Sequence, residues 1–191
     1  MTALIIGLVI FLGLHSVRIV AEPWRTQVRA RVGEAAYKGV YSLLSIAGFV
    51  LIVWGYGQAR QHTVVLWPAL IWARHLAALL VLIAFVLLVA AYVPGNAIKA
   101  KVHHPMLIGV KIWAFAHLLA NNTLADTVLF GSFLIWAVLD FRAARRRDRV
   151  LGTVYAPGRS GPTLVTVVVG AAVFALFAFW LHALLIGVRP F

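Results

Sequence analysis

The chain has 191 residues, of which 63% are hydrophobic and only 12% are charged, and its mean hydropathy is +0.98. A soluble domain of this size cannot cover so much apolar side chain, because most of its residues reach the surface, so the composition predicts an integral membrane protein. The net charge of +12 does not indicate nucleic-acid binding, because the basic residues lie between apolar segments. The absence of cysteine excludes disulfides, thiolate metal sites, iron–sulfur clusters and covalently attached c-type haem.

Six apolar segments are expected to cross the bilayer, which takes about 20 residues in a helix. They cover residues 2–20, 37–57, 67–92, 105–120, 124–139 and 163–188. The first has no basic start and no small-residue cleavage site, so we expect it to stay as an anchor and not to be removed as a signal peptide. The fourth and fifth are short and predict a helical hairpin. The predicted fold class is therefore all-α, a polytopic transmembrane bundle that forms one domain over residues 1–191.

Turn and capping signals separate these segments. Residues 22–38 form a polar connector that favours a short surface helix. Pro94-Gly95-Asn96 predicts a turn, and Asn122 or Thr123 is the candidate N-cap of the fifth span. Residues 140–162 carry six arginines and are expected to form a basic loop.

The basic residues predict the orientation of the spans. They follow the first, third and fifth spans, whereas Arg60 and Arg189 follow even-numbered spans. Basic residues gather on the cytoplasmic side of membrane proteins, so six spans place both termini away from the cytoplasm. None of the five carboxylates lies in the middle of an expected span, which argues against a proton or cation pump.

Five histidines lie within or at the ends of the expected spans, an excess for membrane segments, where ionisable residues usually face the bundle interior. They are His15, His75, His104, His117 and His182. Imidazole is the commonest metal ligand and the usual axial ligand of b-type haem. By depth along the helices, His104 lies near the level of His15. An outer cluster of His75, His117 and His182 is the alternative arrangement.

Two spans carry the same stripe of a glycine, an aromatic residue and a histidine at i, i+4 and i+8. The stripes are Gly7, Phe11 and His15 in the first span, and Gly109, Trp113 and His117 in the fourth. Residues at this spacing stack along one face of a helix. Two such faces would hold a flat aromatic cofactor between them. The alternative is that the small residues only let two helices pack closely.

Roles are also predicted for two arginines and for the two histidines outside the spans. Arg18 is a candidate contact for a haem propionate at the cytoplasmic boundary, and Arg74 is a candidate propionate or substrate contact or a buried polar brace. His62, in a loop, and His103, at the level of the headgroups, are expected to be solvated. The sequence lacks an HxxxH repeat, the helical spacing that would indicate a zinc site.

The segment His104-Pro105-Met106-Leu107-Ile108-Gly109, followed by Trp113 and by His117-Leu118-Leu119-Ala120-Asn121, resembles the NnrU family of membrane proteins. The likeness extends to Leu14-His15-Ser16-Val17-Arg18 and to His182, and it covers nearly the whole chain. The resemblance implies a bacterial inner-membrane protein linked to denitrification, through the expression or maturation of nitrite and nitric oxide reductases.

A plant relative of that family, zeta-carotene isomerase, is a haem b membrane enzyme, and its two ligand histidines match His15 and His117 here. The resemblance therefore implies non-covalent haem b with these two axial ligands, doing electron transfer or sensing. His104, His75 and His182 are the reserve ligands. The plant enzyme has a cysteine where this chain has Ala114, which argues against ligand switching through a thiolate.

Three other functions stay open at this stage. One is a haem-dependent cis–trans isomerase of a carotenoid-like polyene, a hydrophobic substrate that enters from the lipid. Another is a non-catalytic assembly factor for denitrification enzymes. The third rests on a likeness of the His104-Pro105-Met106 segment to membrane methyltransferases that bind S-adenosylmethionine. In that likeness His103 replaces an arginine, and residues 140–152 lack the expected pair of glutamates.

Overall fold

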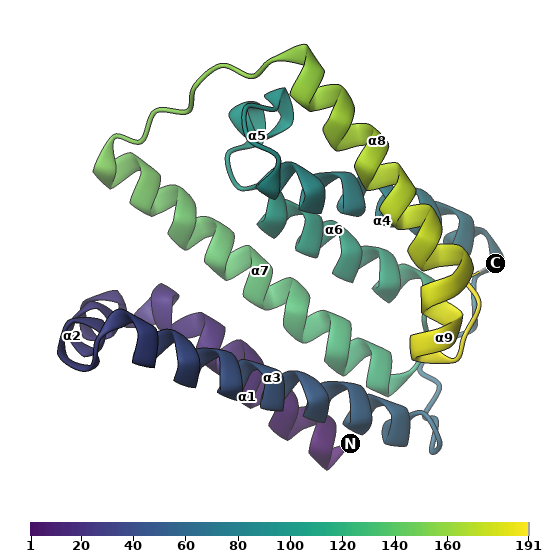
Figure 1. The fold of residues 1–191 in the computed structure, drawn as a ribbon. Helices are drawn as coiled ribbons and strands as arrows, with labels where there is room; N and C mark the ends of the chain where they lie inside the picture. The colour runs from purple at the N-terminus through teal and green to yellow at the C-terminus, as the bar shows by residue number, and fades with distance from the viewer. Residues whose placement is uncertain (191) are drawn as a thin grey trace.

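The computed structural model describes residues 1–190, with Ile71 described by its backbone alone, and these residues form helices and no strand (Figure 1). The helices are α1 (Thr2–Val20), α2 (Glu22–Val32), α3 (Glu34–Ala59), α4 (Ile71–Tyr92), α5 (Ala97–Val102), α6 (Pro105–Ala120), α7 (Leu124–Leu151), α8 (Ser160–Leu176), the π-helical turn η1 (Phe177–Leu181) and α9 (His182–Ile186). The predicted all-α polytopic bundle is confirmed.

Five helical runs in the described part of the chain are long and apolar enough to cross a membrane. They are α1, α3, α4, α7 and the continuous run of α8, η1 and α9, and α6 is a shorter apolar helix. Large apolar side chains cover the outside of the bundle, with Leu43 69% and Leu164 66% exposed. Soluble monomers rarely expose so much apolar surface, whereas a lipid bilayer covers it, so the chain is a multi-pass membrane protein.

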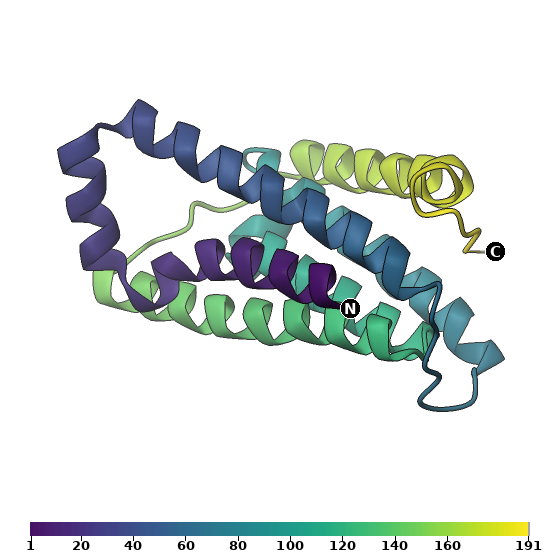
Figure 2. The same ribbon diagram turned by 90° about the horizontal axis from the view of Figure 1, so that it is seen from below.

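The long helices stand in a row in which each contacts its neighbours, in the order α3, α1, α7, α6, α4 and α8. Figure 2 shows α1 between α3 and α7, and Figure 1 shows α7 between that pair and α6. Glycines allow the backbones of α1 and α3 to touch. A Cβ on Gly7 would lie 2.6 Å from the Ile52 backbone nitrogen, and one on Gly55 would lie 2.3 Å from that of Leu4. Backbone contact of this kind replaces hydrophobic driving force inside a membrane.

The fifth span is longer than expected. The helix does not stop at residue 139 but continues to Leu151, so the prediction of a basic loop over residues 140–162 is wrong for its first half. Alanine and arginine favour helix, and Asp148 pairs with Arg145 one turn earlier at 3.7 Å. The helix ends at Gly152, which adopts the left-handed conformation of a C-cap (φ 60°). The loop that remains covers residues 152–159.

Local signals decide the other boundaries. Of the two N-cap candidates, Asn122 and Thr123, the structure uses Thr123, which also forms a capping box with Asp126. The third span begins at Ile71 and not at residue 67, because Pro68 interrupts the backbone and the Trp67 carbonyl accepts a hydrogen bond from Asn122 (2.7 Å). Asn96 caps the short helix α5, which the sequence did not predict.

Basic residues gather at one end of the bundle, as the orientation argument expects. That basic end consists of α2, α5, the last turns of α1 and α7, and the start of α3 and α6 (Figure 1). Arg60 lies at the opposite end, where its Nη1 donates to the Ile186 carbonyl (2.9 Å). The one-sided distribution is the pattern that membrane insertion imposes on Lys and Arg.

Candidate functional site

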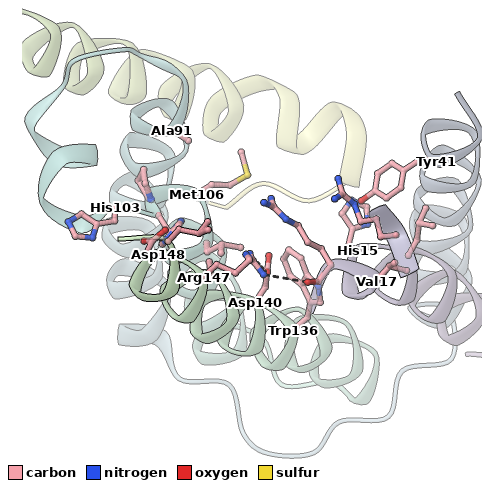
Figure 3. A pocket seen from close by; sticks show the side chains of 18 of the residues that line it. His15, Val17, Tyr41, Ala91, His103, Met106, Trp136, Asp140, Arg147 and Asp148 are labelled. Atoms are coloured by element: carbon pink, nitrogen blue, oxygen red, sulfur yellow. Dashed lines mark hydrogen bonds and ion pairs between the residues drawn. The ribbon is translucent and has the colours of Figure 1, made fainter. Parts of the chain in front are cut away.

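A cavity of about 670 Å³ opens at the basic end of the bundle, between the α1–α2–α3 unit and the helices α4 to α7 (Figure 3). Its volume falls within the range of roughly 300–1,000 Å³ that is usual for small-molecule sites. His15 of α1 and His104, the N-cap of α6, both line it. The structure thus brings these two histidines to the same cavity.

His15 presents a free nitrogen. Its Nδ1 lies 2.7 Å from the Phe11 carbonyl oxygen, one turn back along α1, and its ring stacks on the Phe11 ring at 4.3 Å. Tyr41 and Trp136 approach the ring edge-on at 5.3 and 6.1 Å. With Nδ1 donating its proton to a carbonyl, Nε2 carries the lone pair, and it has no hydrogen-bond partner within residues 1–190. This is the arrangement of a metal-ligating histidine.

His104 is held by a carboxylate. Its Nε2 lies 2.8 Å from Oδ2 of Asp148, and the Tyr155 hydroxyl donates to the same oxygen at 3.1 Å. Burial, together with the hydrogen bond to Asp148, raises the pKa of Tyr155 above its ordinary value. This network ties the start of α6 to the end of α7 and to the loop that follows. It leaves Nδ1 as the nitrogen of His104 that is available to a ligand.

His103 is only partly exposed, and the loop after α7 holds its ring, whereas the sequence suggests a solvated side chain. Its ring stacks on Tyr155 at 4.1 Å with an angle of 4° between the planes, and its Nδ1 contacts Arg145. The backbone explains the difference, because His103 has a φ of 67°, in the left-handed region that non-glycine residues rarely adopt. The chain reverses there and turns the ring onto the loop. His62 is exposed, as expected.

His117 has the same local geometry as His15 but lies outside the cavity. Its Nδ1 is 2.9 Å from the Trp113 carbonyl oxygen, and its ring stacks on Phe130 at 4.5 Å. Phe133 of α7 links the two stripes, since its ring centre is 5.9 Å from that of Phe11 and 5.6 Å from that of Trp113. His15 and His117 therefore lie on helices that flank α7, with aromatic rings between them.

The other predicted site residues are more dispersed. Arg74 and His75 are exposed on α4. His182 contacts the Val188 carbonyl oxygen through Nδ1 at 2.7 Å. Gly109 packs against α4, where a Cβ would lie 3.0 Å from the Ala84 carbonyl oxygen. Within residues 1–190, no group of three or more His, Asp or Glu side chains is placed to hold a metal ion.

The family model described as NnrU protein matches residues 3–190, nearly the whole chain. The chain belongs to the NnrU family. The match includes every residue of the cavity and both aromatic–histidine stripes. No curated protein and no solved structure matches the chain.

Four side-chain polar atoms of this NnrU protein are buried without a hydrogen-bond partner among the described residues, and two of them line the cavity. These two are Nε1 of Trp136 and Oδ1 of Asp140, which follow one another by one turn of α7. Asp140 Oδ1 lies 3.5 Å from Nη2 of Arg147, so its charge is balanced. Buried polar atoms are almost always satisfied, so the unpaired Trp136 Nε1 is the donor that a ligand or water in the cavity would satisfy. Sequence reasoning missed both residues because it ended the helix before their shared face could be recognised.

The cavity of the NnrU protein is electropositive. Six Lys and Arg side chains line it against two carboxylates, Asp140 and Asp148. The cations are Arg18, Arg25, Arg29, Lys38, Lys99 and Arg147. Ion pairs involve five of the six cations: Glu22 pairs with Arg18 and Arg25, Glu34 with Arg29 and Lys38, and Asp140 with Arg147. The excess positive charge suits an anionic ligand, and of the six only Arg18 was singled out from the sequence.

Proposed function

We propose that this NnrU protein binds haem b non-covalently in the cavity at its basic end, with His15 as an axial ligand. The observation that carries the proposal is the free Nε2 of His15, which lines a cavity with a large excess of Lys and Arg. Imidazole is the common axial ligand of b-type haem. The carbonyl that accepts from Nδ1 fixes the tautomer and the ring orientation that ligation requires.

The rest of the cavity supports a flat ligand with two carboxylates. Arg18, Arg25 and Arg29 offer guanidinium groups that bind carboxylates with two parallel hydrogen bonds. Tyr41 and Trp136 offer aromatic walls beside His15. The unpaired Trp136 Nε1 is a donor that an acceptor on the ligand would satisfy. The donor set therefore fits haem b and its propionates.

Two histidines are candidates to hold the haem iron together with His15. His104 lines the same cavity as His15, and its carboxylate-bound Nε2 leaves Nδ1 to the ligand. A carboxylate on the far nitrogen is a usual feature of metal-ligating histidines. The family resemblance instead implies His117, whose Nε2 is free but whose ring is enclosed by Phe130 and Trp113. The geometry favours His104.

When bound, haem b supplies one-electron chemistry. The residues of the chain then hold it in place, balance the charge of its carboxylates and set its exposure to water. We propose that the protein uses this for electron transfer or sensing in the bacterial inner membrane, in support of nitrite and nitric oxide reductases. The basic end faces the cytoplasm in this proposal and the termini face the periplasm, in keeping with the distribution of Lys and Arg.

Acid–base enzyme chemistry in the same cavity is the second candidate function, and the His104–Asp148 pair is the observation that favours it. A carboxylate orients an imidazole and raises its basicity, as a general base requires. The methyltransferase likeness points to S-adenosylmethionine as the probe. Calorimetric binding of that compound by the wild type, lost in Asp148→Asn, would favour this function over haem binding.

Absorption spectroscopy of the purified protein tests the main proposal. We expect a Soret band, with sharp α and β bands after reduction by dithionite and a shift with nitric oxide. His15→Ala should lose most of the haem, whereas the control His62→Ala, in an exposed loop, should keep it. Loss of haem in His104→Ala but not in His117→Ala assigns the second ligand to the cavity, and the reverse assigns it to His117. A colourless, iron-free wild type would contradict the proposal.

A further inference from the structure

The outward face of α7 changes from apolar to basic within one helical turn. Ile135 and Leu139 are 65% and 48% exposed. Arg142, Arg146 and Arg149 are also exposed and continue the same stripe at spacings of three and four residues, which keeps all five on one side of the helix. The change from apolar to basic marks the depth at which this face leaves the hydrocarbon and meets the lipid headgroups.

These three arginines carry uncompensated charge. None of them forms an ion pair with another residue of the described chain. Their neighbours on α7 differ, because Arg145 pairs with Asp148 at 3.7 Å and Arg147 pairs with Asp140 at 3.5 Å. The outward stripe is thus the part of the arginine-rich segment that remains available to an external anion.

Helix length places the stripe at the membrane surface. The 28 residues of α7 span roughly 42 Å at 1.5 Å per residue, against a hydrocarbon core of about 30 Å. The capping box at Thr123 lies at the opposite end, so the arginine end is free to project beyond the core. Val150 and Leu151, which are 78% and 77% exposed, lie beside the arginines as apolar contacts at the interface.

A groove of about 1080 Å³ runs along this part of α7, and Arg18, Ile19 and Glu22 form its other wall. Phe141 and Val150 contribute apolar lining, and the outward arginines line the groove beside them. A groove that combines apolar and cationic lining matches an amphiphile with a phosphate group and acyl chains. Basic pockets between helices at the cytoplasmic surface bind anionic lipid headgroups in this way.

We propose that this groove binds the headgroup of an anionic phospholipid, with Arg146 and Arg149 contacting the phosphate. The site does not depend on haem binding. Arg18 and Arg147 line both the groove and the cavity, so they are left unchanged in the test.

Native mass spectrometry of the delipidated full chain, titrated with phosphatidylglycerol or phosphatidylcholine, tests the proposal. The double variant Arg146→Gln/Arg149→Gln is compared with Arg31→Gln/Lys101→Gln, which removes the same charge from exposed positions at the same end of the bundle. We expect the wild type and the control to prefer phosphatidylglycerol. The groove variant should bind it about tenfold more weakly, because each arginine contributes to the attraction of an anionic headgroup.

Two results of this titration would contradict the proposal. Equal binding of the two lipids by the wild type would overturn the proposal, and so would equal loss in both double variants. Should the groove variant fail to insert, Arg146→Lys/Arg149→Lys keeps the charge and removes the planar fork. A modest loss of phosphatidylglycerol binding in that variant supports arginine contacts to phosphate, and an unchanged affinity contradicts them.

Discussion

The Tyr56 hydroxyl donates a 2.5 Å hydrogen bond to Oδ1 of Asp126, and this contact joins α3 to the first turn of α7. Asp126 is buried, and its other oxygen accepts from the Thr123 hydroxyl at 2.6 Å. The Asp126 carboxylate therefore accepts hydrogen bonds both from the N-cap of its own helix and from a neighbouring helix. The pair lies at the end of the bundle opposite the cavity.

Removal of the Tyr56 hydroxyl is expected to destabilise the bundle. Tyr56→Phe takes a donor from a buried carboxylate, and hydrogen bonds to charged groups contribute about 1.5–3 kcal/mol to stability. Thermal unfolding of the detergent-solubilised protein should show a lower midpoint. Tyr92→Phe is the control, because Tyr92 is 76% exposed. Equal midpoints for both variants would contradict the role of the hydrogen bond.

Substitution of two glycines in α3 should separate helix packing from helix propensity. A Cβ on Gly55 meets the backbone of α1 at 2.3 Å, whereas one on Gly57 meets nothing within 4 Å. Gly55→Ala must push α1 and α3 apart, at a cost of about 1–3 kcal/mol or more. Gly57→Ala should be neutral or stabilising, because alanine favours helix by up to about 1 kcal/mol over glycine. Chaotrope unfolding of the two variants gives the comparison, and a similar loss in both would contradict it.

The capping box of α7 makes a third prediction. Thr123→Ala removes the side chain that accepts from the Asp126 backbone nitrogen, which should lower the free energy of unfolding by about 1 kcal/mol. Thr26→Ala, on the exposed surface of α2, is the matched control and should have little effect. Hydrogen exchange at the first turn of α7 is the measurement. Unchanged protection there in Thr123→Ala would show that the cap is dispensable.

Asp148→Asn should loosen the loop after α7, because Asp148 holds both His104 and Tyr155. Limited proteolysis within residues 152–159 should become faster. The control Asp140→Asn changes a carboxylate that does not contact the loop, and it should leave the rate unchanged. Equal rates in the wild type and Asp148→Asn would contradict the prediction.

The same variant has a pH signature. Burial and the hydrogen bond to Asp148 raise the pKa of Tyr155, so the folded state keeps a proton that the unfolded state has lost. Its contribution to stability is present below pH of about 10 and declines as the pH rises toward the folded-state pKa. Ultraviolet titration of the phenol, with Tyr155→Phe to assign the signal, should show a lower pKa in Asp148→Asn. An unchanged pKa would contradict the effect of the carboxylate.

The sequence predicted the spans well because their length and hydropathy are local properties. It also narrowed the N-cap of α7 to Asn122 or Thr123, and the structure uses Thr123. It failed where the outcome depends on distant contacts. The added turns of α7 carry Asp148, which pairs with Arg145 on its own helix and with the distant His104, the N-cap of α6.

Most of the cavity lining was not predictable for a related reason. Membrane helices are apolar on every side, so their pattern does not reveal which face meets which neighbour. Trp136 and Asp140 become site residues only because α7 packs between the α1–α3 pair and α6. Likewise, the aromatic–histidine stripes appear equivalent in sequence, yet only the one in α1 reaches the cavity.

In the row of helices, α7 connects the closely packed pair α1 and α3 to the remaining helices. Few other contacts join the two parts, such as the hydrogen bond between Arg60 and Ile186 at the far end. A small tilt of this one helix would therefore change the width of the cavity and of the arginine groove together. Lipid bound in the groove would then influence how readily the proposed haem enters or leaves, without any contact between lipid and haem.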